Sequence, residues 1–208
     1  MKTIAETLLE IGAVSFSLNP PFTLSSGLKS PIYCDNRLNI SYIHERNIIV
    51  DTFIQLIRAE FSDVDVIAGV STGGIAWAAW IAEELSLPMV YIRGEAKGHG
   101  KGKRVEGVIH PQQKIVIIED LFSTGKGSLQ AVDAIEEETE GEILSIIAIV
   151  SYELDIMKFQ FSQRGLVYRS LETFENLLTT AIQTNHIPQE YKMKIIEWQK
   201  NPQEWNYL

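Results

Sequence analysis

Residues 115–128, IVIIEDLFSTGKGS, are the stretch that decides the fold. Four apolar residues lead into two consecutive acids, Glu119 and Asp120, which are followed by a loop of hydroxyl residues and glycines and then by helix-forming sequence. This order is typical of a buried parallel strand that delivers two carboxylates and a short loop to one end of a sheet.

The loop after the acids suits a phosphate group. Its small residues, at 123–125 and 127, let main-chain N–H groups turn inward, and a helix beginning near Gly127 adds its positive end. Glu119 and Asp120 cannot serve the same phosphate because like charges repel, so they should face sugar hydroxyls or a metal. A sugar phosphate satisfies both halves of the segment.

Two common phosphate-binding motifs are absent from the sequence. No glycine lies five residues before a Gly-Lys pair, as a Walker loop requires, and no G-x-G-x-x-G occurs. On composition alone, the segment could equally be an ordinary strand–turn–helix connection with solvated acids.

Length and charge narrow the class of protein. A chain of 208 residues with 45% hydrophobic content can bury one sizeable core, so we expect a single domain over residues 1–208. The net charge of -9 argues against general binding of nucleic acid or membrane.

No long apolar run or signal peptide is evident, which predicts a cytoplasmic protein. With Cys34 as the only cysteine, any metal should be a hard ion held by oxygen.

The apolar pattern predicts alternating strands and helices, and hence an α/β fold with right-handed crossovers and a parallel sheet. Ligands should then bind at the carboxyl ends of the strands. Trp198 and Trp205 should cover the core, whereas Trp77 and Trp80 suit packing or a subunit contact. Helices are expected at residues 42–59, 75–85, 129–137, 171–183 and 188–199, and strands at 64–68, 89–92, 115–118, 143–150 and 166–168.

Two further strand ends carry unusual sequences. GVSTGG at residues 69–74 is either a tight turn before a helix or a second phosphate-binding loop. RGEAKGHGKGKR at residues 93–104 holds five Lys or Arg residues and His99 against one acid, Glu95. Such a segment is usually a solvated turn, but its length and glycines favour a lid that closes over a pyrophosphate.

Three basic side chains of this lid can converge on one polyanion: Arg93, Lys97 and His99. With cations beside it, His99 suits donation to a departing phosphate better than action as a base. The other histidines, His44, His110 and His186, have no partner in the sequence pattern, and we interpret them as structural or solvent-facing.

The acidic pair and its loop resemble the ribose-phosphate motif of the type I phosphoribosyltransferases. Four blocks in order resemble the orotate phosphoribosyltransferase family: F-T-L-x-S-G-x-K-S-P from Phe22, G-G-I from Gly73, R-x-E-A-K-x-H-G from Arg93 and E-D-x-x-S-T-G from Glu119. The block at residues 22–37 would otherwise be interpreted as a surface hairpin, and it is the one that indicates this member of the larger family.

The resemblance implies a parallel-sheet type I phosphoribosyltransferase fold with helices on both faces and a small N-terminal hood contributed by residues 1–40. It implies a pentosyltransferase that converts orotate and phosphoribosyl pyrophosphate into orotidine 5-phosphate and pyrophosphate, in de novo synthesis of UMP. Mg²⁺ would be held mainly through the substrate, and the lid would act on the neighbouring subunit of a homodimer. A phosphoribosyltransferase for another nucleobase and a non-catalytic regulator that binds phosphoribosyl pyrophosphate remain alternatives.

The resemblance also implies roles for residues. Catalysis and the pyrophosphate group are assigned to Arg93, Lys97 and His99. The ribose phosphate is assigned to Glu119, Asp120, Leu121, Phe122, Ser123, Thr124, Gly125, Lys126 and Gly127. The second pyrophosphate loop is Ser71, Thr72 and Gly73, and orotate is assigned to Ser123, Ser25, Lys29, Tyr33 and Cys34.

The chain departs from the family pattern at three places. Gly94 stands where many members have a lid lysine, and Ser25 stands where many have a lysine beside the base. An arginine that some members use for the orotate carboxylate is not evident at residues 152–154. We expect Lys29 or Arg37 to take over that role, and Lys97 to be the principal lysine of the lid.

Overall fold

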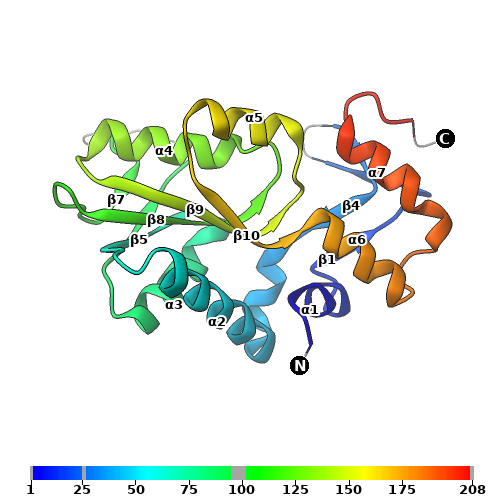
Figure 1. Ribbon diagram of the computed structural model, residues 1–208, viewed down its shortest axis with the longest axis horizontal. Coiled ribbons are helices and arrows are strands. Elements are labelled where there is room, and N and C mark those ends of the chain that lie inside the picture. Colours follow the sequence, from blue (N-terminus) through cyan, green and yellow to red (C-terminus); the bar gives the residue numbers. More distant parts are fainter. Residues whose placement is uncertain (1, 25–26, 95–101, 207–208) are drawn as a thin grey trace.

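A computed structural model describes residues 2–24, 27–94 and 102–206. Its centre is a six-stranded sheet with the order β10-β9-β8-β5-β6-β7 (Figure 1). All neighbouring pairs are parallel except β6 and β7, which pair antiparallel at one edge. The strands are β5 (Val66–Val70), β6 (Met89–Ile92), β7 (Val105–Glu106), β8 (Lys114–Phe122), β9 (Glu142–Ser151) and β10 (Tyr168–Thr173).

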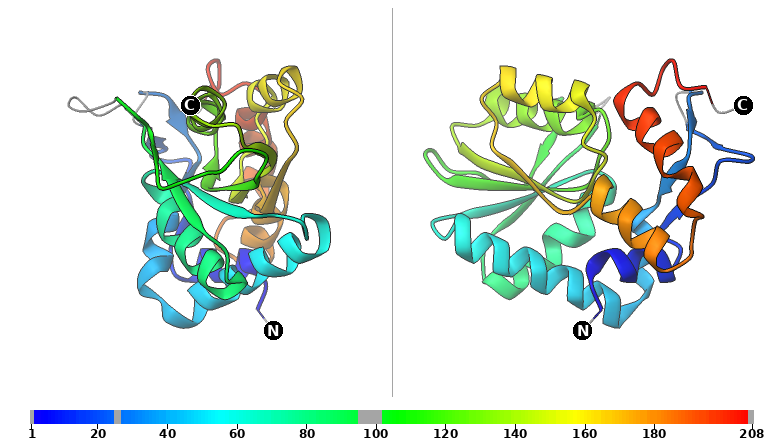
Figure 2. Two further views of the ribbon diagram at one scale, coloured as in Figure 1. Left: turned by 90° about the vertical axis from the view of Figure 1, so that its left-hand side faces the viewer. Right: turned by 45° about the vertical axis from the view of Figure 1, so that its right-hand side comes forward.

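Helices cover both faces of this sheet, as Figures 1 and 2 show from three directions. α2 (Ile43–Glu60) and α3 (Gly73–Leu85) lie on one face, and α4 (Lys126–Glu138) and α5 (Asp155–Gln163) lie on the other. The predicted α/β class, with a mostly parallel sheet and helices on both faces, is confirmed.

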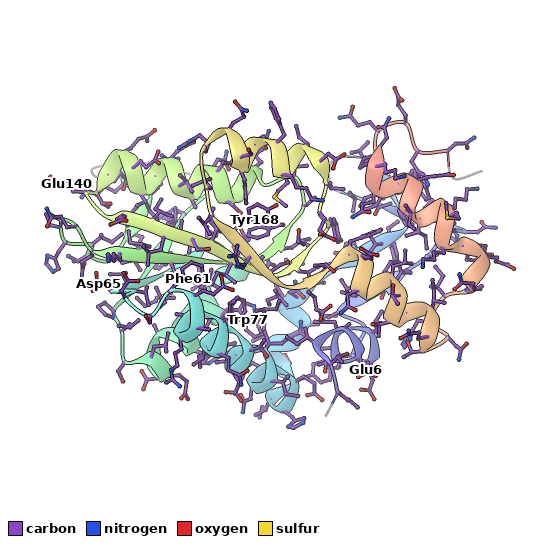
Figure 3. All side chains as sticks on the ribbon, in the orientation of Figure 1. Glu6, Phe61, Asp65, Trp77, Glu140 and Tyr168 are labelled. Carbon is purple, nitrogen blue, oxygen red and sulfur yellow. The ribbon has the colours of Figure 1, made fainter. Side chains whose placement is uncertain are left out.

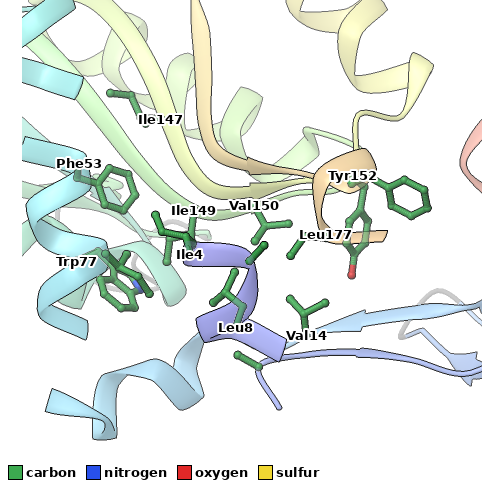
Figure 4. Packing of buried hydrophobic residues seen from close by; sticks show 14 of the residues in the cluster. Ile4, Leu8, Val14, Phe53, Trp77, Ile147, Ile149, Val150, Tyr152 and Leu177 are labelled. Atoms are coloured by element: carbon green, nitrogen blue, oxygen red, sulfur yellow. The ribbon is translucent and has the colours of Figure 1, made fainter. Parts of the chain in front are cut away.

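The central strand β8 is buried on both faces because its apolar side chains alternate between two core layers. Val116 and Ile118 belong to the layer beneath α2 and α3, which Figure 4 shows around Phe53 and Trp77. Ile115 and Ile117 belong to the layer on the side of α4 and α5. At the carboxyl end of β8 the apolar run gives way to Glu119 and Asp120.

The N-terminal region and the C-terminal helices lie together beyond the carboxyl edge of the sheet (Figure 2). In Figure 3, Asp65 and Glu140, which precede β5 and β9, mark the opposite edge. The N-terminal elements are α1 (Ile4–Glu10), β1 (Val14–Phe16), β2 (Phe22–Thr23), β3 (Lys29–Ser30), β4 (Ile32–Cys34) and the 3-10 helix η1 (Asn36–Ser41). The C-terminal ones are α6 (Phe174–Gln183), η2 (Gln189–Tyr191) and α7 (Lys192–Lys200).

The two tryptophans of the C-terminal region are buried, as predicted, with Trp198 1% and Trp205 9% exposed. Trp77 is fully buried and packs edge-on against Trp80 with 5.5 Å between ring centroids, so it serves packing. Among the described residues no helix is long and apolar enough to cross a bilayer. The cytoplasmic location stays a prediction.

Past Ser151 one sequence expectation was wrong and one helix was missed. Residues 171–173, expected in a helix, belong to β10, because they continue the pairing with β9 as far as Thr173 opposite Ser151. The helix begins only after Thr173, whose hydroxyl caps it by accepting from the main chain of Asn176. α5 was not predicted at all, although Met157 and Phe161 are buried one helical turn apart.

Gly74 gives a direct test of how closely α3 approaches β8. A Cβ at Gly74 would lie 2.2 Å from the main-chain oxygen of Ile118, whereas a Cβ at Gly127 would meet only Glu119 Oε2, at 3.7 Å. We expect Gly74→Ala to lower the free energy of unfolding by about 1–3 kcal/mol or more. Gly127→Ala, the matched control within α4, should leave it unchanged or raise it by up to about 1 kcal/mol. Equal denaturant midpoints for the two variants would contradict the packing described.

Candidate functional site

The site forms where the strand order reverses. β5 leads to β6 on one side, whereas β8, which comes later in the chain, lies on the other side of β5. In open parallel sheets the crevice outside the carboxyl ends of two such strands is where ligands bind. Here β5 leads into the loop of residues 71–73, and β8 carries Glu119 and Asp120 near its carboxyl end.

The two acids reach toward two different helix starts. A Cβ at Gly73 would lie 2.2 Å from Asp120 Oδ2, so the Asp120 carboxylate lies against the first turn of α3. Glu119 lies toward α4, where the Ser128 hydroxyl donates to Glu119 Oε2 at 3.4 Å. The acidic pair therefore spans the space between both helix starts.

Glu119 is held in a way that favours its neutral form. It is only 7% exposed, and burial raises the pKa of its carboxyl well above the ordinary value, with the negative charge of Asp120 adding to the effect. The main-chain N–H of Asp120 donates to Glu119 Oε1 at 3.1 Å and opposes the shift. A ligand that donates hydrogen bonds, as sugar hydroxyls do, would favour the charged form.

The loop after β8 presents main-chain donors, and the helix that follows it has no side-chain cap. Gly125 is the N-cap of α4 in a left-handed conformation, with φ 79°, and no side chain caps the helix there. A Cβ at Gly125 would also lie 2.7 Å from Phe161 Cε1, so α5 packs directly on the loop. Uncapped N–H groups at a helix start are the groups that bind a phosphate.

The loop after β5 has the same character. α3 begins after Thr72 without a side-chain cap, and the peptide between Ser71 and Thr72 is cis. The Ser71 hydroxyl accepts from the main chain of Gly94 at 3.1 Å. This contact joins the loop to the first residues of the basic segment at 93–104.

The basic segment begins and ends beside the site, although Glu95, Lys97 and His99 lie outside the described residues. Its two ends are joined by a hydrogen bond from Arg93 N to Arg104 O of 2.9 Å. Arg93 is also 3.5 Å from Glu106 across the same strand pair. The Arg104 side chain turns to α4 and pairs with Glu137 at 2.6 Å, so Arg104 serves the fold.

Comparison with known proteins agrees with this geometry. Residues 37–164 match the family described as "Phosphoribosyl transferase domain". The orotate phosphoribosyltransferase of Listeria innocua is 45% identical over 204 residues, covering 98% of this chain and 97% of that protein. That of Bacillus caldolyticus is 46% identical over 202 residues, covering 97% of both. A crystal structure of orotate phosphoribosyltransferase from Aeropyrum pernix has a TM-score of 0.76 at 26% identity, covering 86% of this chain and 97% of that one.

The chain belongs to the orotate phosphoribosyltransferase family. The resemblance inferred from the sequence blocks is therefore confirmed, and with it the class of phosphoribosyltransferase enzymes. The comparisons assign no individual residue a role, so the predicted site residues stay predictions.

The N-terminal region, where the resemblance predicts a hood over residues 1–40, is joined to β8 next to the acidic pair. The Asn36 amide donates to the main-chain oxygen of Asp120 at 2.6 Å. Burial raises the pKa of the Cys34 thiol, and the charges of Asp120 and Asp35 raise it further, so this thiol is neutral. Asn36 was not singled out by sequence reasoning, because nothing in the local pattern indicates a partner 84 residues away.

The predicted base-binding side chains of the hood are engaged with neighbours. Lys29 Nζ donates to the Thr23 hydroxyl at 2.7 Å. Arg37 pairs with Asp35 at 2.6 Å. The Tyr33 ring packs on Phe22 with 5.6 Å between centroids. Ser25 lies outside the described residues.

A cavity of about 330 Å³ lies between the N-terminal region, the loop after β8 and the C-terminal segment. Leu24 and Leu28 line it from the hood, and Ser123 and Thr124 line it from the loop after β8. The remaining walls are residues 154–156 and 198–203. The sequence indicated Trp198 as a core residue, but no motif pointed to the C-terminal segment as part of the site.

Other predicted features are placed as follows. His44, His110 and His186 are exposed, as expected. Within the part of the chain that the structure describes, no cluster of three or more His, Cys, Asp or Glu side chains could hold a metal ion.

The raised pKa of Glu119 predicts how its removal changes stability with pH. In the unfolded chain the Glu119 carboxyl loses its proton near its ordinary pKa of 4.5, whereas in the folded protein it keeps the proton to higher pH. As the pH rises from the unfolded pKa to the folded pKa, this group therefore lowers the free energy of unfolding. Glu119→Gln should therefore be more stable than the wild type at pH 8, with a difference that grows by at most about 1.4 kcal/mol per pH unit. The difference should vanish toward pH 4.5.

Chemical denaturation without substrate at several pH values measures this difference. Glu190→Gln, at an exposed position, controls for the loss of one carboxylate. If Glu119→Gln were less stable than the wild type at pH 8, the folded protein would not disfavour the charged form of Glu119, and the raised pKa would be contradicted.

Proposed function

We propose that this chain transfers the 5-phosphoribosyl group from phosphoribosyl pyrophosphate to orotate, giving orotidine 5-phosphate and pyrophosphate. One observation carries the proposal: a carboxylate pair lies between two uncapped helix starts at the strand-order reversal. A ligand that fits must carry hydroxyl donors between two anionic groups, and phosphoribosyl pyrophosphate has this arrangement.

Each part of the site then has a role. Glu119 and Asp120 accept from the ribose hydroxyls, and the N–H groups of residues 123–127 bind the 5-phosphate. Leu121 and Phe122 anchor that loop, since Phe122 is buried against Phe161 with 5.5 Å between ring centroids. The loop of residues 71–73 binds the pyrophosphate.

Breaking the anomeric bond places positive charge on the ribose and negative charge on the departing pyrophosphate. Catalysis then depends on positioning and on groups that stabilise these charges, and no covalent nucleophile is needed. Arg93, Lys97 and His99 are assigned to the pyrophosphate. Mg²⁺ would be held mainly by the substrate's own phosphate oxygens and would supply positive charge to the leaving group.

The proposal includes a homodimer in which the lid of one subunit acts on its partner's site. Three large apolar side chains on neighbouring turns support a protein contact, because Leu38, Tyr42 and Ile43 are 44%, 45% and 66% exposed.

A base panel tests the reaction. Mixed with phosphoribosyl pyrophosphate and Mg²⁺, the protein should release pyrophosphate with orotate, and not with hypoxanthine, adenine or uracil. Release with a purine would indicate a phosphoribosyltransferase for another base. Tight binding of phosphoribosyl pyrophosphate without release with any base would indicate a regulator.

Lys97→Ala tests the lid. We expect it to lower kcat by roughly a hundredfold or more, the loss seen when one preorganised donor is removed. Near-normal turnover would reject the assignment of Lys97.

Mixing variants tests whether the lid acts in trans. A mixed dimer of Lys97→Ala and Asp120→Asn subunits keeps one site with an intact acidic pair and an intact partner lid. Equimolar re-association of the two inactive variants should restore about a quarter of wild-type activity, since about half the dimers are mixed and each has one working site. No recovery, with mixed dimers detected by mass, would show that the lid acts within its own subunit.

A further inference from the structure

The C-terminal end of α7 contributes a charged side chain to the cavity beneath the hood. We propose that Lys200 binds the carboxylate of the pyrimidine substrate and thereby sets the preference for orotate over uracil. This inference rests on the proposed function, because it names the group that recognises the substrate's acid.

α7 is fixed against both the hood and the sheet just before Lys200. Trp198 Nε1 donates to the main-chain oxygen of Lys29 in β3 at 2.9 Å. Gln199 Nε2 donates to the main-chain oxygen of Tyr152, which follows β9, at 3.2 Å. Two successive residues of α7 are thus anchored, and the next one, Lys200, lines the cavity.

The residues after α7 close the same wall. Trp205 is buried and its indole donates to the main-chain oxygen of Lys194 at 2.8 Å, which folds residues 201–206 back along the helix. Residues 201–203 line the cavity as a result. The position of Lys200 is therefore set by contacts on both sides of it along the chain.

The charged side chains of the cavity favour Lys200 as the partner of the substrate carboxylate. Among the described residues that line the cavity, Lys200 is the one cation and Asp155 the one acid. Within the same described part of the chain no carboxylate forms an ion pair with Lys200. Of the residues that the structure describes along this lining, Lys200 is therefore the one lysine or arginine that a substrate carboxylate could meet.

The candidates taken from the sequence are occupied elsewhere. Lys29 donates to Thr23, Arg37 pairs with Asp35, and neither lines the cavity. Tyr152, in the region where some relatives carry an arginine, is 2% exposed, and burial raises the pKa of its phenol. A cation from the C-terminal segment compensates for the missing arginine.

The opposite wall supplies the polar partners for the ring. Ser123 lines the cavity from the phosphate loop, while Leu24, Leu28 and Leu154 supply apolar surface around it. A flat, partly polar ring with one acidic group matches this lining, since pockets of this kind combine apolar walls with a few placed polar groups.

Asp155 should affect orotate binding in the opposite direction to Lys200. It stands in the first turn of α5 and lines the cavity with Lys200. Its negative charge repels a substrate carboxylate and attracts Lys200. Asp155→Asn should therefore lower the KM for orotate, whereas Lys200→Met should raise it.

The experiment compares four variants with the wild type, which must first form orotidine 5-phosphate. Lys200→Met should raise the KM for orotate roughly tenfold to a hundredfold, because one hydrogen bond to a charged group is lost. The KM for phosphoribosyl pyrophosphate and the inhibition constant of uracil, which lacks the carboxylate, should stay within about twofold. Lys200→Arg should restore most of the affinity for orotate, and Lys192→Met, the same change on the same helix outside this cavity, should have no effect.

Two outcomes overturn the proposal. One is an unchanged KM for orotate in Lys200→Met at a wild-type unfolding midpoint. The other is equal weakening of orotate and uracil, which would mean that Lys200 only holds α7 in place. Failure of the wild type to use orotate at all is a different result and rejects the proposed function itself.

Discussion

The close approach of α3 and α4 to the carboxyl end of β8 is the constraint on which the rest of the site depends. Gly74 brings the main chain of α3 against Ile118, and Gly73 leaves room for the Asp120 carboxylate. Ser128 holds Glu119 from the other helix. Two carboxyl groups are thereby kept between two positive helix ends. Burial disfavours the charged form of Glu119, and a ligand that supplies hydroxyl donors would favour it.

In the proposed function, the N-terminal region and the C-terminal helix α7 supply the walls that select the base. Asn36 ties the hood to the main chain of Asp120, and Trp198 ties α7 to the hood. The cavity is consequently built from segments at both ends of the chain, and Ser123 lines it from the loop after β8. The same sheet edge can serve different bases when only these flanking segments change.

Local patterns predicted most of the fold and the sheet edge at which the candidate site lies. The run from Ile115 to Asp120 required a strand buried on both faces, and the strand-ending loops could be placed at one edge because parallel strands share their carboxyl ends. The helix α5 was missed because the amphipathic signal past Ser151 is short. Residues 171–173 of β10 were assigned to a helix because pairing with β9 overrides their local preference. Contacts such as Asn36 with Asp120 join distant segments, and no local pattern encodes them.

The central claim is that the acidic pair binds the ribose while the start of α4 binds its 5-phosphate. A crystal structure of the protein with phosphoribosyl pyrophosphate and Mg²⁺ measures this directly. We expect the Glu119 and Asp120 carboxylates within about 3 Å of the ribose hydroxyls, and the 5-phosphate against the N–H groups of residues 123–127. Phosphoribosyl pyrophosphate bound with its ribose hydroxyls away from both carboxylates, or with its 5-phosphate at residues 71–73, would contradict the account.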